Sequence, residues 1–324
     1  MTQAIMPPEW AAQEWLWIGF PHLAEEWPGW LEPAQKQIAD FASAVAESGQ
    51  VVRLLVRDEA NAARARQLVS SKVMLETRRY GDVWLRDTGP LVLSDRTALR
   101  CRFNGWGGKY LMPGDEEIGA ELARDAGLKV AESDWILEGG AVDGDGTGCV
   151  LTTEQCLLNP NRNPELSRQE IEARLARDLG FGRTVWLGDG LINDHTDGHV
   201  DNLARFVAPG EVALPRATGN DDPNTAIYAD ARARILAAGL KLHEIPSPGL
   251  IERDGKIEPA SYANFAITTH LVVVPTFDSP HDQEGVAAIA QLFPDRATIG
   301  LPGEAVLAGG GGFHCASQQM PRLG

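Results

Sequence analysis

The sequence predicts an α/β protein built from repeated units. Amphipathic helical segments alternate with short apolar runs along the whole chain, which is typical of this fold class. Five polar stretches recur at intervals of roughly fifty to sixty-odd residues, each beside a strand-like run, where functional loops usually lie. This spacing predicts five structural repeats whose loops converge on one centre. The stretches are 84–90, 138–140, 195–202, 262–264 and 309–321.

The first third of the chain is predicted to hold three strands separated by two helices. Ile38, Phe41 and Val45 recur at helical spacing and mark the apolar face of the first helix, which Gly49 ends. The predicted strands are 16–20, 51–56 and a run near 73–76, and the predicted helices are 34–47 and 59–69.

The same alternation continues towards the C-terminus. Ser167 and Glu170 have the spacing of a capping box, so a helix should begin just after Ser167. The stretch 143–148 resembles half of a calcium loop but lacks its terminal Glu, and we expect a hairpin turn there. No Gly-rich phosphate fingerprint follows the early strands, so a nucleotide-binding fold has no support. The predicted helices are 116–126, 168–179, 224–238 and 282–292, and the predicted strands are 149–152, 183–187, 241–245, 271–275 and 297–300.

The charge of the chain limits the classes of partner that it can bind. The 324 residues carry a net charge of −16, with no basic cluster. Nucleic acids and anionic membranes require Lys and Arg patches, so we expect neither as a partner, whereas an acidic chain favours small cationic ligands. The N-terminus lacks a signal-peptide pattern, and no apolar run approaches the roughly eighteen residues of a membrane span. We expect one domain over 1–324, and the residues leave its oligomeric state open.

The four cysteines form no CxxC pair, and they are too sparse for a disulfide scaffold or a structural zinc site. We therefore expect a reducing cytoplasm. Cys315 stands apart because four glycines, 309–312, precede it. Glycines supply no packing, but they allow unusual backbone angles and the close approach of another group. Cys315 is the candidate nucleophile, and the other three cysteines are expected to be core residues.

The polar stretches supply the partners that a cysteine nucleophile needs. A thiolate is favoured by a nearby His, which an acid orients, and either His195 or His199 could be that base. Glu138 or one of the aspartates could orient it. Further carboxylates in the same cavity would be costly unless a cation neutralised them. A planar guanidinium, held bidentately by carboxylates, fits this requirement well.

Six segments, in this order, resemble the agmatine deiminase and bacterial-type peptidylarginine deiminase family of the guanidine-modifying (pentein) superfamily. The resemblance runs from about residue 7 to the end and so covers nearly the whole chain, and six co-linear matches are far more specific than one Gly-rich Cys segment. They are 84–90, 138–140 with 145–156, 159–164, 198–206, 261–265 and 310–321.

The resemblance implies a five-bladed α/β-propeller of ββαβ-type units around a central active site. It also implies that Cys315 is the nucleophile and His199 the general acid/base. Glu138 would be the partner of His199. Asp87 and Asp201 would grip the guanidinium nitrogens, with Trp84 along the substrate. The reaction so implied needs no metal or other cofactor. It converts agmatine to N-carbamoylputrescine and ammonia through an S-amidino intermediate.

Simpler interpretations of the same residues stand beside this one. Arg86 and Asp87 could form a plain surface pair, and Trp84 could be core packing. Alternation along a strand would place His199 and Asp201 on one face. The run 197–201 also fits the Asp-x-His-x-Asp pattern of dimanganese ureohydrolases, but the other ligand sets of that class are missing from the sequence. A non-catalytic binder of cationic amines is the third alternative.

The identity of the substrate depends on which residue meets the end of the molecule that is distant from the guanidinium, here called the tail. Agmatine deiminases usually carry an acid where this chain has His195, so the tail end departs from the family pattern. Agmatine is the first expectation. Free or peptide-terminal arginine remains the alternative, because a His tolerates a carboxylate better than a Glu does.

Overall fold

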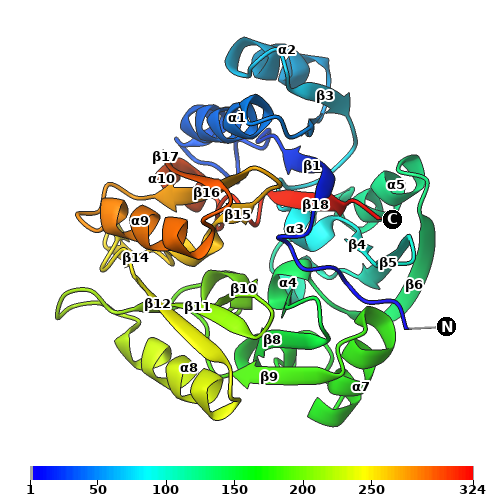
Figure 1. The fold of residues 1–324 in the computed structure, drawn as a ribbon. Coiled ribbons are helices and arrows are strands. Elements are labelled where there is room, and N and C mark those ends of the chain that lie inside the picture. The colour runs from blue at the N-terminus through cyan, green and yellow to red at the C-terminus, as the bar shows by residue number, and fades with distance from the viewer. Residues whose placement is uncertain (1–2, 324) are drawn as a thin grey trace.

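The computed structural model describes residues 3–323, whose strands form five small sheets around a common centre, together with one two-stranded ribbon (Figure 1). In each of the five sheets the first strand pairs antiparallel with the second, which runs parallel to the third. Helices connect the parallel strands and lie on the outside of the ring (Figure 1). This is the five-bladed α/β-propeller that the sequence predicted.

The elements follow the ring in chain order. The first blade holds β18 (Ser317–Pro321), β1 (Gln13–Gly19), α1 (Leu31–Glu47), β2 (Val52–Val56), α2 (Glu59–Leu68) and β3 (Met74–Thr77). The second holds α3 (Leu85–Thr88), β4 (Leu91–Val92), β5 (Thr97–Arg102), α4 (Gly105–Gly108), α5 (Asp115–Asp125) and β6 (Lys129–Ile136). The third holds η1 (Gly139–Ala141), β7 (Asp143–Gly144), β8 (Cys149–Thr153), α6 (Glu154–Leu157), α7 (Arg168–Leu179) and β9 (Arg183–Leu187).

The last two blades repeat the pattern. The fourth holds η2 (Val200–Asn202), β10 (Arg205–Ala208), β11 (Glu211–Arg216), α8 (Thr225–Ala237) and β12 (Lys241–Pro246). The ribbon β13 (Glu252–Arg253) and β14 (Lys256–Ile257) follows. The fifth holds η3 (Tyr262–Asn264), β15 (Ala266–Ile267), β16 (Leu271–Thr276), α9 (Asp282–Leu292), β17 (Ala297–Pro302) and α10 (Glu304–Leu307).

A short helical turn precedes the first strand of every blade. These turns are α3, η1, η2 and η3, and the turn that contains Cys315 just before β18. Neighbouring turns touch: α3 contacts η1, η1 contacts η2, and η2 contacts η3. The Arg86 amide donates to the Cys315 carbonyl at 3.0 Å and so joins α3 to the last turn. Five segments far apart in sequence therefore meet at the centre of the ring.

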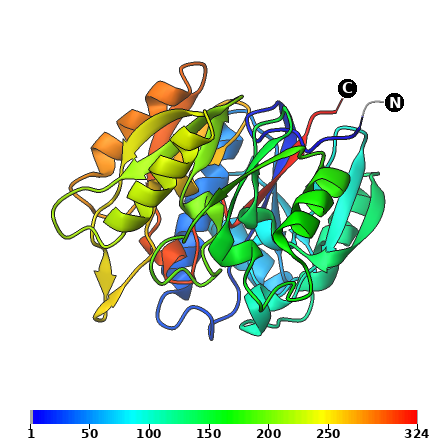
Figure 2. The ribbon, with the colours of Figure 1, turned by 90° about the horizontal axis from the view of Figure 1, so that it is seen from below.

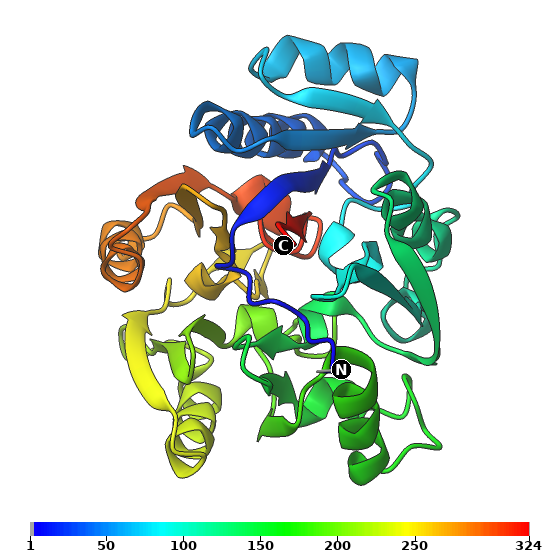
Figure 3. The ribbon, with the colours of Figure 1, turned by 45° about the vertical axis from the view of Figure 1, so that its right-hand side comes forward.

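Both ends of the chain help to close the ring. β18 pairs antiparallel with β1, so C-terminal and N-terminal strands share one blade (Figure 1). The segment before β1 runs across one face of the propeller (Figure 3), and both ends of the chain lie towards that face (Figure 2). In this N-terminal segment, the Ile5 amide donates to Ser94 Oγ in the second blade, and the Met6 amide donates to the Leu179 carbonyl in the third.

Most of the predicted elements are confirmed, with bounds that differ by a few residues. Ser167 caps α7 through the predicted capping box, and β7 and β8 form the predicted hairpin around 143–148. The short strands β4, β7 and β15, and the longer β5, β6, β10, β11 and β18, were not predicted. Over residues 3–323, no helix is both long and apolar enough to cross a membrane.

Candidate active site

A cavity of about 110 Å³ opens at the centre of the ring, and Cys315 lies in its wall. The Cys315 side chain is almost fully buried, at 4% exposure, so the sulfur is reached through the cavity. Predicted site residues Trp84, Asp87 and His195 line the same cavity. The full lining is Glu26, Asp82, Trp84, Asp87, Trp106, Tyr110, His195, Thr196, Ala308, Gly309, Gly310, Gly311 and Cys315.

The glycine run has the role that the sequence indicated. Gly310 has a φ of 111°, which a side chain would strain. A methyl group on Gly311 would lie 2.7 Å from Trp84 Cζ3 and 3.0 Å from Cys315 Cβ. The loop therefore passes between the indole and the thiol with no room for a side chain. Trp84 itself is buried and stacks on Trp27 with ring centroids 5.8 Å apart.

The sulfur of Cys315 has two polar neighbours. Asn264 Nδ2 lies 3.0 Å from Sγ, and Asp201 Oδ2 lies 3.4 Å from it. Asn264 Oδ1 also accepts from the backbone amides of His314 and Cys315, at 3.1 and 3.3 Å. Asn264 thus fixes the turn that carries the thiol. The sequence marked 262–264 as a polar stretch, but Asn264 was not among the predicted site residues.

Asp87 is held rigidly by the protein, and the surface-pair interpretation of Arg86 and Asp87 is wrong because both side chains are buried. Asp87 Oδ1 accepts from the Gly140 amide at 2.8 Å, and Oδ2 accepts from Trp106 Nε1 at 2.8 Å. Asp87 Oδ1 also lies 3.7 Å from His199 Nδ1. These contacts fix the carboxylate at the wall of the cavity.

Gly140 shows how closely three functional groups gather. A methyl group at this position would lie 2.6 Å from His199 Nδ1, 2.9 Å from Asp87 Oδ1 and 3.1 Å from Asp201 Oδ2. Because all three atoms face the same point, the base and both predicted guanidinium-binding acids converge on the η1 turn.

His199 and Asp201 do not lie on a strand, so the predicted alternation is wrong. His199 is the residue before the 3₁₀ turn η2, and Asp201 lies within that turn. His199 has a non-helical backbone, with φ −54° and ψ 139°, and its side chain and that of Asp201 both face Gly140. Both side chains are fully buried behind the cavity wall.

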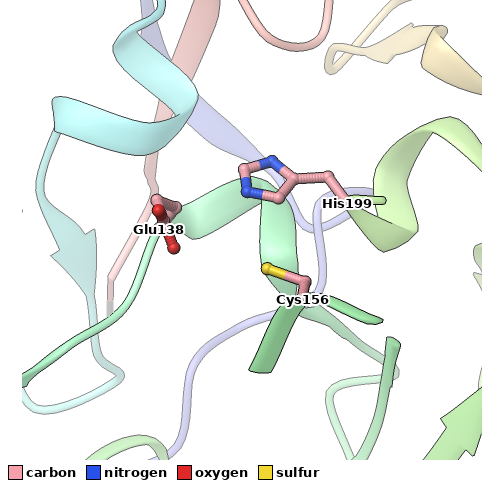
Figure 4. Close-up of side chains that lie close together, drawn as sticks. All are labelled: Glu138, Cys156 and His199. Carbon is pink, nitrogen blue, oxygen red and sulfur yellow. The ribbon is translucent and has the colours of Figure 1, made fainter. Parts of the chain in front are cut away.

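Glu138 lies beside His199, with Cys156 as a third neighbour (Figure 4). One ligand-type atom from each of these residues lies within 4.8 Å of the other two, and all three side chains are buried. Glu138 Oε1 accepts from Arg162 Nε at 2.6 Å. Cys156 was expected to be only a core residue, yet its thiol adjoins the predicted base. Its partners come from other turns, so its own position in the sequence gave no signal.

Several buried polar atoms in this group lack a hydrogen-bond partner among residues 3–323. They are both ring nitrogens of His199, Oε2 of Glu138 and Oδ1 of Asp201. Buried polar atoms are nearly always paired in folded proteins, and exceptions mark functional positions. A ligand with several N–H donors would supply partners for the two carboxylate oxygens.

Two buried arginines pair with four further acids around the site. Arg162 pairs with Asp197 Oδ2 at 2.7 Å as well as with Glu138. Arg205 pairs with Glu9 and, at 2.8 Å, with Asp143 Oδ2. The sequence interpretation saw no cluster of basic residues, because these arginines come from separate blades and meet only in the fold.

His314 links one of these pairs to the thiol. Its Nδ1 lies 2.7 Å from Asp201 Oδ2, and its Nε2 lies 2.9 Å from Glu9 Oε2. The sequence interpretation assigned His314 no role. In the structure it holds the carboxylate that lies against Cys315, and the N-terminal segment holds His314 in turn.

The pKa values of the two predicted guanidinium-binding acids, Asp87 and Asp201, shift in opposite directions. Burial raises the pKa of Asp87, although His199 partly opposes this. Burial also acts to raise the pKa of Asp201, but the hydrogen bond and charge of His314 outweigh it, and the pKa of Asp201 falls below its usual value. Asp201 is therefore stabilised as a carboxylate by the protein, whereas Asp87 needs a further cation.

The pKa values of the predicted nucleophile, Cys315, and of the predicted base, His199, are also shifted. Burial, with the charges of Asp201 and Asp87, raises the pKa of the Cys315 thiol well above its usual value. Burial acts to lower the pKa of His199, but Asp87 and Cys156 outweigh it and raise the pKa well above the usual value. The site thus favours a neutral Cys315 thiol and a protonated His199 imidazole.

The dimetal alternative does not fit this geometry. Asp197, the first acid of the Asp-x-His-x-Asp pattern, is held by Arg162 and, at 2.8 Å, by Lys109. Two cations on one carboxylate oppose a divalent ion there. Within residues 3–323, the His, Cys, Asp and Glu side chains close enough to hold a metal are Glu138, Cys156 and His199, a set without either aspartate of the pattern.

A cysteine among acids and a histidine, at the centre of a five-bladed α/β-propeller, defines the class of guanidine-modifying pentein folds. The chain belongs to the Porphyromonas-type peptidyl-arginine deiminase family, whose profile matches residues 5–321. It is 38% identical to the agmatine deiminase of Pseudomonas putida over 354 aligned positions, which cover 98% of this chain and 95% of that protein.

Solved structures agree with this family. The chain is similar to an agmatine deiminase of Enterococcus faecalis, with a TM-score of 0.93 and 30% identity over 98% of this chain and 96% of that one. It is also similar to a cysteine-to-serine variant of C. jejuni agmatine deiminase with substrate bound. That comparison gives a TM-score of 0.91 and 27% identity over 99% and 97% of the two chains.

Proposed function

We propose that the protein is an agmatine deiminase, a hydrolase that converts agmatine and water to N-carbamoylputrescine and ammonia. The observation that carries this proposal is the position of Cys315. Its Sγ lies in the wall of a cavity lined by Asp87 and 3.4 Å from Asp201, while arginines neutralise the more distant acids. We assign the guanidinium to Asp87 and Asp201, because carboxylates bind this planar cation bidentately and Asp201 lies against the thiol.

The first step uses the charge of the substrate. A guanidinium between Asp87 and Asp201 offsets the two charges that oppose a thiolate, so its binding lowers the pKa of Cys315. The thiol releases its proton to solvent, the thiolate Sγ attacks the guanidinium carbon, and the π electrons of one C–N bond move onto its nitrogen. The carboxylates keep the carbon electrophilic, because a neutral guanidine is resonance-stabilised and reacts poorly.

The second step uses His199. Its protonated ring, maintained beside Asp87 and Glu138, donates a proton to the departing nitrogen, and ammonia leaves. His199 then accepts a proton from the water that attacks the S-amidino carbon, and the C–S bond breaks. Trp84 packs along the substrate chain. The same proposal includes a reducing, cytoplasmic setting, because the nucleophile must remain a thiol, and all four cysteines are free.

The test is ammonia release from agmatine, arginine and a peptide with terminal arginine, with and without a chelator. We expect agmatine to be the preferred substrate, with the chelator having no effect. Cys315→Ala should lower the rate by at least ~10⁴-fold, as removal of a covalent nucleophile does. Mass spectrometry of acid-quenched enzyme should find an amidino adduct on Cys315. Full activity in Cys315→Ala, or equal rates with agmatine and arginine, would refute the proposal.

A further inference from the structure

Two acidic side chains of the cavity wall take no part in the chemistry described above. Glu26 comes from the segment between β1 and α1, and Asp82 lies two residues before Trp84. Glu26 is half-buried, and among residues 3–323 it makes no hydrogen bond or ion pair that would neutralise it. Asp82 is buried, at 5% exposure.

His195 offers no negative charge at the cavity. Its side chain is exposed, it lies against Gly310, and its ring centroid is 6.2 Å from that of Tyr110. An imidazole cannot attract a substrate ammonium by charge, whether it is neutral or protonated. Agmatine deiminases carry an acid at the position of His195, and this chain therefore lacks that carboxylate in its cavity.

We propose that Glu26, supported by Asp82, binds the cationic tail of the substrate and replaces the missing acid at position 195. The inference rests on the proposed deiminase function and specifies its substrate class. That class is a guanidine with a second positive charge at its far end and no carboxylate there.

The raised pKa of Asp82 agrees with its position beside Glu26 in the cavity wall. Burial, with the charges of Asp115 and Glu26, raises the pKa of Asp82 to about 7. Asp115 is engaged elsewhere, since its Oδ1 accepts from the amides of Gly81 and Asp82 at 2.8 and 3.0 Å. Glu26 and Asp82 are thus two neighbouring acids facing the cavity without a cation between them. An ammonium there would favour both carboxylates, whereas the carboxylate of arginine would be repelled.

The test compares agmatine with pentylguanidine, in which a methyl group replaces the ammonium. Glu26→Gln should lower kcat/KM for agmatine about tenfold, mainly through KM, because a half-exposed carboxylate is partly screened. The same variant should leave pentylguanidine turnover within about twofold, which also reports that the variant is folded. Glu25→Gln is the matched control, because Glu25 is exposed and does not line the cavity.

A second variant tests the sign of the charge. Glu26→Lys should reduce the preference for agmatine over arginine further than Glu26→Gln does. An unchanged agmatine KM in Glu26→Gln, or equal losses with agmatine and pentylguanidine, would overturn the inference but leave the deiminase function standing. Absence of ammonia release from every guanidine in the wild-type protein would instead refute the proposed function, and this inference with it.

Discussion

The α3 and η2 turns carry Asp87 and Asp201, the two acids predicted to bind the guanidinium. The surroundings of these two carboxyl groups shift their pKa values in opposite directions. On α3, Asp87 accepts two neutral donors, a backbone amide and an indole N–H, and burial raises its pKa. On η2, Asp201 is held by His314, and its pKa is lowered. One acid is stabilised as a carboxylate before substrate arrives, and the other becomes so when the cation binds.

This difference has a consequence for catalysis. An acid that is costly to ionise in the empty site interacts more favourably with an arriving cation than one that is already neutralised. Asp201 and His314 fix the geometry around the thiol. We infer that Asp87 couples cation binding to thiol activation, since it lies in the cavity wall and its charge acts on both Cys315 and His199.

Asparagine at each position should separate the two roles, and it should give the largest effect among the variants that test this contrast. Asp87→Asn and Asp201→Asn should both lower kcat by ~10²–10³-fold, the range typical of removing one electrostatic stabiliser. Their effects on folding should differ in pH dependence. Because the pKa of Asp87 is raised, ionised Asp87 destabilises the fold increasingly above its unfolded pKa, so wild type should lose stability relative to Asp87→Asn between pH 4 and pH 7.

Asp201→Asn should unfold at a lower temperature. A lowered pKa contributes stability above the unfolded pKa, and that contribution is lost as pH falls through the folded pKa. Thermal unfolding at pH 7 and at pH 4 measures both effects. The difference between Asp201→Asn and wild type should persist at pH 4, because the folded pKa of Asp201 lies below its usual value, whereas the difference between Asp87→Asn and wild type should change between the two pH values. The same pH dependence in both variants would contradict the proposed contrast.

Gly140→Ala tests whether both turns depend on the same close approach. The added methyl would meet His199, Asp87 and Asp201 at 2.6–3.1 Å, so these side chains must move apart. We expect kcat to fall by roughly 10²-fold, since small displacements of catalytic groups have such effects. Overpacking should cost about 1–3 kcal/mol of the free energy of unfolding.

Gly182→Ala is the control for that variant, because no other group lies within 4 Å of a methyl there. It should retain wild-type kcat in the same ammonia assay. Wild-type kcat in Gly140→Ala would show that the three side chains can separate without loss, and the convergence at η1 would then have no catalytic importance.

The sequence predicted those parts of the molecule that depend on local pattern. The periodicity of 34–47 and the capping box at Ser167 specify helices without help from the rest of the chain, and both are confirmed. The spacing of five polar stretches predicted a common centre, because each repeat places its loop at the same end. The short turns η1, η2 and η3 were missed, because three residues contain no periodicity.

The parts of the site that the sequence did not predict are those created by contacts between segments that are distant in sequence. Arg162 of the third blade pairs with Glu138 and Asp197, and Asn264 of the fifth blade contacts Cys315. Trp106 was missed for the same reason, since its hydrogen bond to Asp87 joins two turns of the second blade with no shared pattern. Motif matching predicted which groups react, and the fold was needed to find the groups that contact them.

We expect the smallest effect on kcat from a substitution at Cys156, a residue of α6 whose thiol lies near His199. Its thiol contributes to the raised pKa of His199, so Cys156→Ala should lower that pKa. If protonated His199 is the acid for ammonia departure, the basic limb of the kcat–pH profile should move to lower pH. We expect the maximal kcat to change by less than about tenfold, because Cys156 touches only the base. Cys149→Ala, a buried cysteine in β8 of the same blade, should leave the profile in place. A basic limb that stays fixed in Cys156→Ala would mean that another group sets it, and that the thiol beside His199 serves packing alone.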